Sequence, residues 1–165
     1  GPERETLAAQ ARRLGVGGIH LLPFLSEEEM TVAYAHAGCA VLPSFHGETW
    51  GLVVNEAMAS GLPVLVSREC GCAATLVEED GNGWTFSPHD EEELAADLGR
   101  IASLPPQAQS RMGRRSQEII AEWSLDRFAA AVWEAIQSCA NVRRGFASPV
   151  DRVLLRLWKG RFRPT

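Results

Sequence analysis

The segment GETWGLVVNEAMASGLPVLV, residues 47–66, decides the fold and also raises the question of function. Its last residues, Pro63 to Val66, form an apolar run that predicts a buried strand. The residues from about Gly51 to Gly61 predict a helix before this strand. Glu48 stands in the loop before that helix, and Glu56 stands about one and a half turns into it. Repulsion and desolvation make such a pair of carboxylates unfavourable for stability, so another explanation is needed.

Short apolar runs alternate with helical patterns along the whole chain. We expect strands at residues 19–22, 39–42, 63–66 and 84–86, and helices at residues 3–14, 26–36, 51–61, 73–77, 90–103, 107–122 and 125–140. Ser26 and Glu29 have the spacing of a capping box, and residues 80–83, Asp-Gly-Asn-Gly, are a turn signal. Continuously apolar strands that alternate with helices are typical of a parallel sheet covered on both faces.

The sequence therefore predicts an α/β fold with a Rossmann-like parallel sheet, followed by C-terminal helices. We expect residues 1–141 to form this domain and residues 142–165 to form a basic C-terminal helix or tail. Because the pattern begins with a helix rather than a strand, we expect the chain to start inside a larger domain.

Composition excludes several classes of function. The net charge of −5 does not favour a nucleic-acid partner, although residues 142–165 carry seven Lys or Arg and one Asp. No apolar run approaches the roughly 20 residues of a membrane span. Four cysteines are too few for a disulfide scaffold and favour a reducing compartment, so we expect a cytoplasmic protein. Cys70 and Cys72 could bind a metal with His46 or His89, but we favour buried thiols and expect no metal.

The loop before the residue 51–61 helix has the features of a ligand site. Ligands of open α/β sheets bind beyond the carboxyl ends of the strands, where the loop at residues 43–50 begins. Gly51 lets the backbone approach a ligand, and the free N–H groups at this helix start can bind an anion. Carboxylates are good acceptors for sugar hydroxyls, which suits Glu48 and Glu56. From spacing alone an alternative stays open, in which Glu48 serves the helix dipole and Glu56 lies on a solvated face.

The sequence LPSFHGETWGLVVNEAMASGLPVLVS, residues 42–67, resembles the donor-binding segment of the glycosyltransferase family 4 type, which has the GT-B fold. The E-x7-E motif of that family matches Glu48 and Glu56. The resemblance runs from Gly1 to about Ser124 in several linked blocks. The flanking matches are Pro43-Ser44, Gly51-Leu52, Glu56-Ala57-Met58-Ala59 and Gly61-Leu62-Pro63-Val64.

This resemblance implies roles for individual residues. Glu48 would contact the transferred sugar near the reacting carbon, and Glu56 would accept hydrogen bonds from the ribose hydroxyls of the nucleotide. Trp50 stands where the family usually has Phe, and packing under the loop is an equally good interpretation of it. The other implied donor-binding positions are Gly47, Thr49, Gly51 and Leu52 around the sugar and diphosphate, and Phe24 and Leu25 at the base.

The resemblance also implies a function and its limits. The chain would be the donor-binding half of a retaining hexosyltransferase that uses a nucleoside-diphosphate sugar, without metal or cofactor, in polysaccharide or glycolipid biosynthesis. The family's upstream Arg/Lys pair and its N-terminal acceptor domain are missing, so we expect the isolated domain to be inactive alone. Thr75 stands where the family often has a Glu. The alternatives are a GT-B sugar-nucleotide epimerase and a non-catalytic nucleotide-sugar-binding or interaction domain.

Three further features have two interpretations each. His46 is either a donor contact or, as we favour, an exposed loop histidine. Arg68 could meet a phosphate, but we favour a surface position. Residues 149–165 could lie on an anionic membrane surface, which would place the protein at the inner face of the cytoplasmic membrane. We favour a C-terminal helix that packs on the missing domain.

Overall fold

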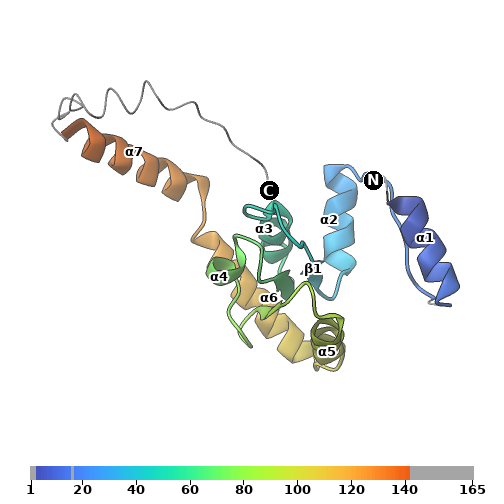
Figure 1. Cartoon of the computed structure of the whole chain (residues 1–165). Coiled ribbons are helices and arrows are strands. Elements are labelled where there is room, and N and C mark those ends of the chain that lie inside the picture. The colour runs from blue at the N-terminus through green and yellow to red at the C-terminus, as the bar shows by residue number, and fades with distance from the viewer. Residues whose placement is uncertain (1–2, 16, 142–165) are drawn as a thin grey trace, which may run out of the picture. The chain divides into compact units, whose positions relative to one another are not determined.

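The computed structural model describes residues 3–15 and 17–141 of the chain (Figure 1). The chain divides into two compact units, residues 1–122 and residues 123–165. The elements of the first unit are α1 (Arg4–Arg13), α2 (Glu27–His36), β1 (Ala40–Leu42), α3 (Leu52–Ala59), β2 (Val64–Ser67), α4 (Ala73–Leu76), β3 (Gly83–Phe86), α5 (Glu91–Ala102) and α6 (Pro106–Ala121). The second unit contains α7 (Leu125–Asn141). The predicted tail at residues 142–165 lies outside the described residues, and the boundary that we expect before it stays a prediction.

The sheet has three parallel strands in the order β1-β2-β3. Ala40 pairs with Val64 across the first ladder, and Val64 pairs with Gly83 across the second. All four residues of the central strand are buried, as its continuous apolar sequence predicts. Because the strands are parallel, their carboxyl ends meet at one edge of the sheet. The loops that follow β1 and β2 therefore begin beside each other.

Helices cover both faces of this sheet, as the sequence predicts. Val64 and Val66 of β2 pack on one face with residues of α3, α4 and α6, including Met58, Leu76 and Ile119. Between them, Leu65 points to the other face. It packs there with Trp84 and Phe86 of β3, Ile101 of α5 and Met112 of α6. The alternation of side chains along one strand thus builds two apolar layers, and these fix α3 against the sheet.

The predicted strand at residues 19–22 is wrong. These residues form no strand, and they pair with no other strand in the described part of the chain. The guanidinium of Arg4 instead donates hydrogen bonds to the carbonyl oxygens of Leu21 (2.6 Å) and Leu22 (3.0 Å). A strand needs a neighbouring backbone to satisfy its polar groups, and here an arginine side chain takes that place.

The predicted capping box at Ser26 and the predicted turn at residues 80–83 are confirmed. The Ser26 hydroxyl accepts a hydrogen bond from the Glu29 N–H, and the Glu29 carboxylate accepts one from the Ser26 N–H, which completes the capping box of α2. In the turn before β3, the buried side chain of Asn82 accepts from the Glu78 N–H and donates to the Leu76 carbonyl. Within the described ranges, no helix has the length and apolarity that a membrane crossing requires.

Candidate functional site

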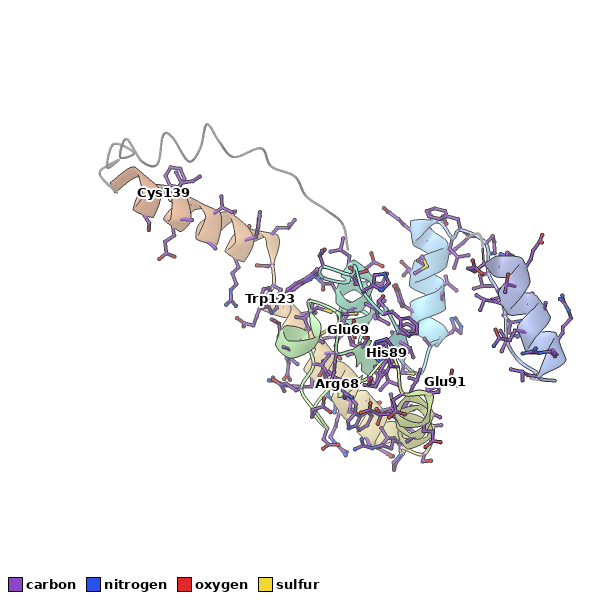
Figure 2. All side chains as sticks on the ribbon, in the orientation of Figure 1. Arg68, Glu69, His89, Glu91, Trp123 and Cys139 are labelled. Carbon is purple, nitrogen blue, oxygen red and sulfur yellow. The ribbon has the colours of Figure 1, made fainter. Side chains whose placement is uncertain are left out.

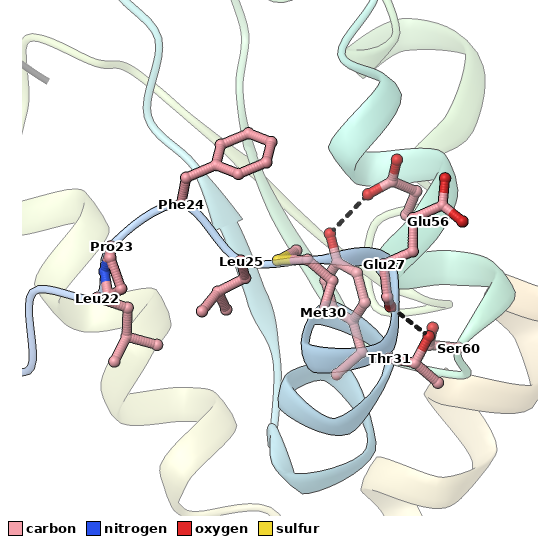
Figure 3. A pocket seen from close by; sticks show the side chains of 10 residues that line it. Leu22, Pro23, Phe24, Leu25, Glu27, Met30, Thr31, Glu56 and Ser60 are labelled. Atoms are coloured by element: carbon pink, nitrogen blue, oxygen red, sulfur yellow. Dashed lines mark hydrogen bonds between the residues drawn. The ribbon is translucent and has the colours of Figure 1, made fainter.

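A pocket of about 830 Å³ lies beside α3, within the range of roughly 300–1,000 Å³ that is typical of ligand sites (Figure 3). Its wall comes from the segment before α2, from α2 itself and from α3. The lining residues are Leu22, Pro23, Phe24, Leu25, Glu27, Met30, Thr31, Tyr34, Glu56 and Ser60. Most of this wall is apolar, and a few polar side chains are added to it. This composition fits a flat apolar group on a small molecule that also carries hydroxyls.

The segment before α2 supplies the most exposed apolar side chain of the pocket. Phe24 is 99% exposed, and Leu22 beside it is 59% exposed. An aromatic ring with no covering residue is a surface on which another flat ring can stack. The two residues expected at the base, Phe24 and Leu25, therefore line the same pocket as Glu56. Their contact with a base stays a prediction.

Glu56 projects from α3 into this pocket (Figure 3). The hydroxyl of Tyr34, on α2, donates a hydrogen bond of 3.0 Å to its Oε2. Burial raises the pKa of Tyr34 to about 12, with further contributions from the hydrogen bond and the negative charge of Glu56. The tyrosine therefore stays protonated at neutral pH and acts as the donor.

Glu48 lies in the loop between β1 and α3 and is half-buried. Its carboxylate accepts a hydrogen bond of 3.3 Å from the Trp50 N–H. Its carbonyl accepts one from the Gly71 N–H (3.2 Å), and the Trp50 carbonyl accepts one from the Cys72 N–H (3.2 Å). The loop that carries Glu48 is thereby tied to the segment after β2, as expected from the common edge of the sheet.

Gly51 begins α3 in a conformation that only glycine readily adopts. Its φ is +99°, and a Cβ there would lie 2.8 Å from Cδ2 of Leu42 and 3.3 Å from Sγ of Cys72. The first N–H groups of a helix have no partner inside it, and those of α3 follow directly. Leu52 and Val53 in this turn are exposed, by 69% and 47%. Gly51 itself is buried, so an anion at this helix start would approach from the side of Leu52 and Val53.

Glu48 precedes α3, and Glu56 lies within it. Glu56 lines the pocket, whereas none of the residues 47–52 does. The structure thus brings Phe24, Leu25 and Glu56 together, and it sets Gly47 to Leu52 at the beginning of the same helix. A ligand that reaches all of these residues must extend from the pocket to the helix start.

The environment of Trp50 favours packing over ligand contact. The indole N–H donates a hydrogen bond of 3.1 Å to the side chain of Asn55, and the ring packs against the core beside the sheet. Trp50 is partly buried rather than open to solvent. The replacement of Phe by Trp at this position is thus accommodated by a side-chain hydrogen bond within α3 and its approach loop.

Arg68 directly follows β2 (Figure 2). Its guanidinium already forms an ion pair with Glu93. Its guanidinium binds both carboxylate oxygens of Glu93, at 2.9 and 2.6 Å, and also donates to the Thr85 carbonyl. The surface position that we favour for Arg68 is therefore the observed one. His46 is exposed, and His89 lies 3.3 Å from a carboxylate oxygen of Glu69 (Figure 2).

The Cys70–Cys72 segment packs under the Glu48 loop, and both thiols are buried. Burial, and then the neighbouring Cys70, raises the pKa of Cys72 to about 11. A thiol in this environment resists the deprotonation that metal binding requires. Within residues 3–15 and 17–141, no group of three or more His, Cys, Asp or Glu side chains could hold a metal ion. Thr75 is exposed on α4 and offers a hydroxyl where the family often offers a carboxylate.

Sequence reasoning misses most of the lining of this pocket, and it also misses Tyr34 and Gly71, which contact Glu56 and the Glu48 loop. Tyr34 is the only tyrosine of the chain and stands in an alanine-containing helix, which is a weak signal. Its hydroxyl meets Glu56 only because α2 packs beside α3, and the spacing within one helix does not show this. Gly71 stands in a small-residue loop, and its close contact with the Glu48 loop depends on the register of β1 and β2.

A parallel α/β sheet whose strands lead at their carboxyl ends into a glycine-started helix is typical of the ligand-binding α/β class of proteins. The profile of the family described as "Glycosyl transferases group 1" matches residues 1–119, which is more than half of the chain. The chain therefore belongs to the glycosyl transferases group 1 family.

Individual relatives agree with this assignment. The chain is 35% identical over 140 residues to the MMP alpha-(1->4)-mannosyltransferase of Mycolicibacterium hassiacum, a match of 81% of this chain and 32% of that protein. The solved structure of sucrose-phosphate synthase from Thermosynechococcus elongatus matches 84% of this chain and 35% of its own, with 26% identity and a TM-score of 0.73. Anabaena HepE in complex with UDP matches 81% of this chain and 36% of its own, with 25% identity and a TM-score of 0.72.

These matches confirm the predicted fold and the membership of the glycosyl transferases group 1 family, and the family 4 type stays a prediction. The described α/β unit has the fold of the C-terminal, donor-side half of GT-B glycosyltransferases. The chain spans about a third of the length of the curated relatives that it matches.

Proposed function

We propose that this chain is the donor-binding half of a retaining glycosyltransferase. The complete enzyme would move a hexose from a nucleoside-diphosphate sugar to an acceptor. The observation that carries this proposal is the Glu56 carboxylate, which faces an apolar pocket of about 830 Å³ and has no cationic partner among the described residues. The named activities of the family relatives support the same reaction class.

Glu56 differs from the glutamates of this chain that are paired with arginines. Glu78 is held by two hydrogen bonds from Arg115, and Glu93 is held by two from Arg68. Glu56 receives its one side-chain hydrogen bond from a neutral hydroxyl. A carboxylate can accept about four hydrogen bonds, so most of its capacity stays open to a ligand. A vicinal diol, such as that of a ribose, is a good match for this capacity.

The proposed donor extends from the pocket to the helix start. Its base lies against Phe24 and Leu25, and its ribose hydroxyls bind Glu56. Its diphosphate lies at the free backbone N–H groups at the start of α3, near Gly51 and Leu52. The transferred sugar lies by Gly47, Glu48 and Thr49. The complex of HepE with UDP supports a uridine nucleotide as the first ligand to test.

The proposed reaction breaks the bond between the anomeric carbon and the diphosphate oxygen. The acceptor oxygen forms its new bond to the same face of the sugar, and its proton passes to the departing diphosphate oxygen. The leaving diphosphate gains negative charge, and fixed N–H groups at the start of α3 stabilise this charge without reorganisation. Glu48 orients the sugar at the reacting carbon. The acceptor site lies outside this chain, on a further domain of the same protein.

The proposal requires neither metal nor cofactor. Donor binding and transfer should therefore be unchanged when EDTA is added, and restoration of a lost activity by Mg²⁺ or Mn²⁺ would contradict this part of the proposal. A cytoplasmic location, as the four cysteines indicate, belongs to the same proposal. Attachment to a membrane surface would involve residues 149–165, which lie outside the described residues. Flotation with anionic liposomes, with and without residues 149–165, tests it.

Two other functions are compatible with the same pocket. A sugar-nucleotide epimerase would bind the same donor and release the altered sugar without an acceptor. A non-catalytic domain would keep its function after loss of both glutamates. Incubation of the longest natural form of the protein with donor alone separates an epimerase from a transferase, because only the epimerase forms product under these conditions.

Calorimetric titration with UDP, GDP and ADP tests the proposed site. We expect one nucleotide to bind, and we expect Glu56→Ala to weaken it by about 1–3 kcal/mol, as for a lost hydrogen bond to a charged group. Glu91→Ala is the matched control, because Glu91 is exposed at the start of α5 and lies outside the pocket (Figure 2). Equal binding by wild type and Glu56→Ala would remove the ribose role. Absence of binding in the longest natural form would overturn the proposed function.

A further inference from the structure

The core holds the ring of Tyr34, and its hydroxyl donates a hydrogen bond to the Glu56 carboxylate in the pocket. The ring is half-buried and packs against the apolar cluster that contains Val54 and Val64. A ring fixed by neighbours on this side has little freedom to move. Its hydroxyl is therefore a fixed hydrogen-bond donor.

Glu56 is the flexible member of this pair. Its side chain is exposed, whereas the neighbouring Ala57 and Met58 are fully buried and anchor α3. Without a partner, an exposed glutamate samples many rotamers and must lose this freedom when it binds a ligand. The 3.0 Å hydrogen bond from Tyr34 to Oε2 restricts that sampling before binding.

The chemical nature of the hydrogen-bond donor to Glu56 matters as much as its position. An arginine partner would neutralise the carboxylate and occupy both oxygens, as Arg68 does at Glu93. The tyrosine hydroxyl contributes one hydrogen bond to one oxygen, so Oε1 stays open and the negative charge is retained. Because the pKa of Tyr34 is raised to about 12, its hydroxyl keeps its proton at neutral pH.

We propose that Tyr34 is a positioning residue, which holds the Glu56 carboxylate in the orientation that accepts the vicinal hydroxyls of the ligand. This inference rests on the proposed function, since it assigns a second residue to the ribose contact of Glu56. The hydroxyl of Tyr34 does not touch the ligand. It acts through Glu56, and its contribution depends on the presence of the ligand diol.

The test compares Tyr34→Phe with wild type on two ligands. The first is the nucleoside diphosphate that binds best among UDP, GDP and ADP, and the second is its 2′,3′-dideoxy counterpart. Tyr34→Phe keeps the ring that packs against the core and removes only the hydroxyl. We expect it to weaken the ribonucleotide about three- to tenfold, the cost of ordering one long side chain on binding, and to leave the dideoxynucleotide unchanged. Glu56→Ala on the same ligands, and the melting temperature of each variant, complete the set.

The outcomes separate this inference from the proposed function. Equal weakening of both ligands by Tyr34→Phe would show a packing role and overturn the inference. Unchanged binding of both ligands, while Glu56→Ala still discriminates between them, would overturn the inference and leave the ribose role of Glu56. If Glu56→Ala itself fails to discriminate, the ribose role falls and the inference falls with it.

Discussion

Gly71 lies directly against Thr49, so that a Cβ added to Gly71 would come within 1.9 Å of the Thr49 carbonyl oxygen. The obstacle is backbone, which cannot turn away as a flexible side chain can. The N–H of Gly71 also donates to the carbonyl of Glu48. Gly71, which lies in the loop after β2, therefore fixes the position of the loop that carries Glu48, a candidate catalytic carboxylate.

Gly71→Ala should move this loop and destabilise the fold. We expect the free energy of unfolding in urea to fall by about 1–3 kcal/mol, the usual cost of an overpacked site. We also expect weaker nucleotide binding, because the displaced loop leads directly into the start of α3. Gly99→Ala is the matched control, since Gly99 lies inside α5 with no heavy atom within 4 Å of an added Cβ. It should stabilise the protein by up to about 1 kcal/mol, and equal stability of the two variants would contradict the argument.

Glu78→Gln should reduce the loss of stability at acid pH. The hydrogen bonds from Arg115 hold the pKa of Glu78 below its usual range in the folded protein. A carboxylate with a lowered folded-state pKa contributes stability above its unfolded pKa, near 4.5, and loses it as the pH falls through the folded pKa. Melting temperatures between about pH 7 and pH 3 should therefore converge for wild type and Glu78→Gln at the acid end.

The expected difference at neutral pH is small, because exposed ion pairs contribute little. Glu91→Gln is the control, since Glu91 is exposed and makes no ion pair in the described ranges. The difference in melting temperature between wild type and Glu78→Gln could instead stay constant across the whole pH range. That result would show that the Arg115 contact does not depend on the Glu78 charge.

The elements of this fold follow from local patterns, whereas the details of the site follow from packing. The strand at β2 and the helix at α3 are predictable, because an apolar run and a glycine-bounded periodic segment are local signals. The strand predicted at residues 19–22 is absent. A strand needs a neighbouring backbone to pair with, and a local sequence pattern does not reveal whether one is present. E-x7-E spacing selects Glu48 and Glu56 as candidate site residues, and their roles stay predictions. It does not reveal Tyr34, whose partner lies on another helix.

The cysteines should differ strongly in reactivity. Cys139 is exposed, whereas Cys70 and Cys72 are buried and burial raises the pKa of both thiols. Iodoacetamide reacts with thiolates, so we expect the native protein to be modified at Cys139 first. Peptide mass spectrometry over time gives the modification rates of Cys70, Cys72 and Cys139. Urea should make Cys70 and Cys72 as reactive as Cys139, and equal rates in the native state would show that the segment under the Glu48 loop opens readily.

Glu48→Gln should lower turnover far more than it lowers donor affinity. The described side-chain hydrogen bond of Glu48 is a long one, 3.3 Å from the Trp50 N–H, so its loss should leave the fold and the diphosphate contacts nearly intact. If Glu48 acts at the reacting carbon, its charge matters most in the transition state, and turnover of the longest natural form should fall by about a hundredfold or more. Nucleotide affinity should change by less than about tenfold, since base, ribose and diphosphate bind elsewhere. Glu69→Gln is the control, because Glu69 is an exposed carboxylate in the loop after β2 that faces His89. Equal turnover by Glu48→Gln and Glu69→Gln would remove Glu48 from the reacting centre and leave a loop-stabilising role for it.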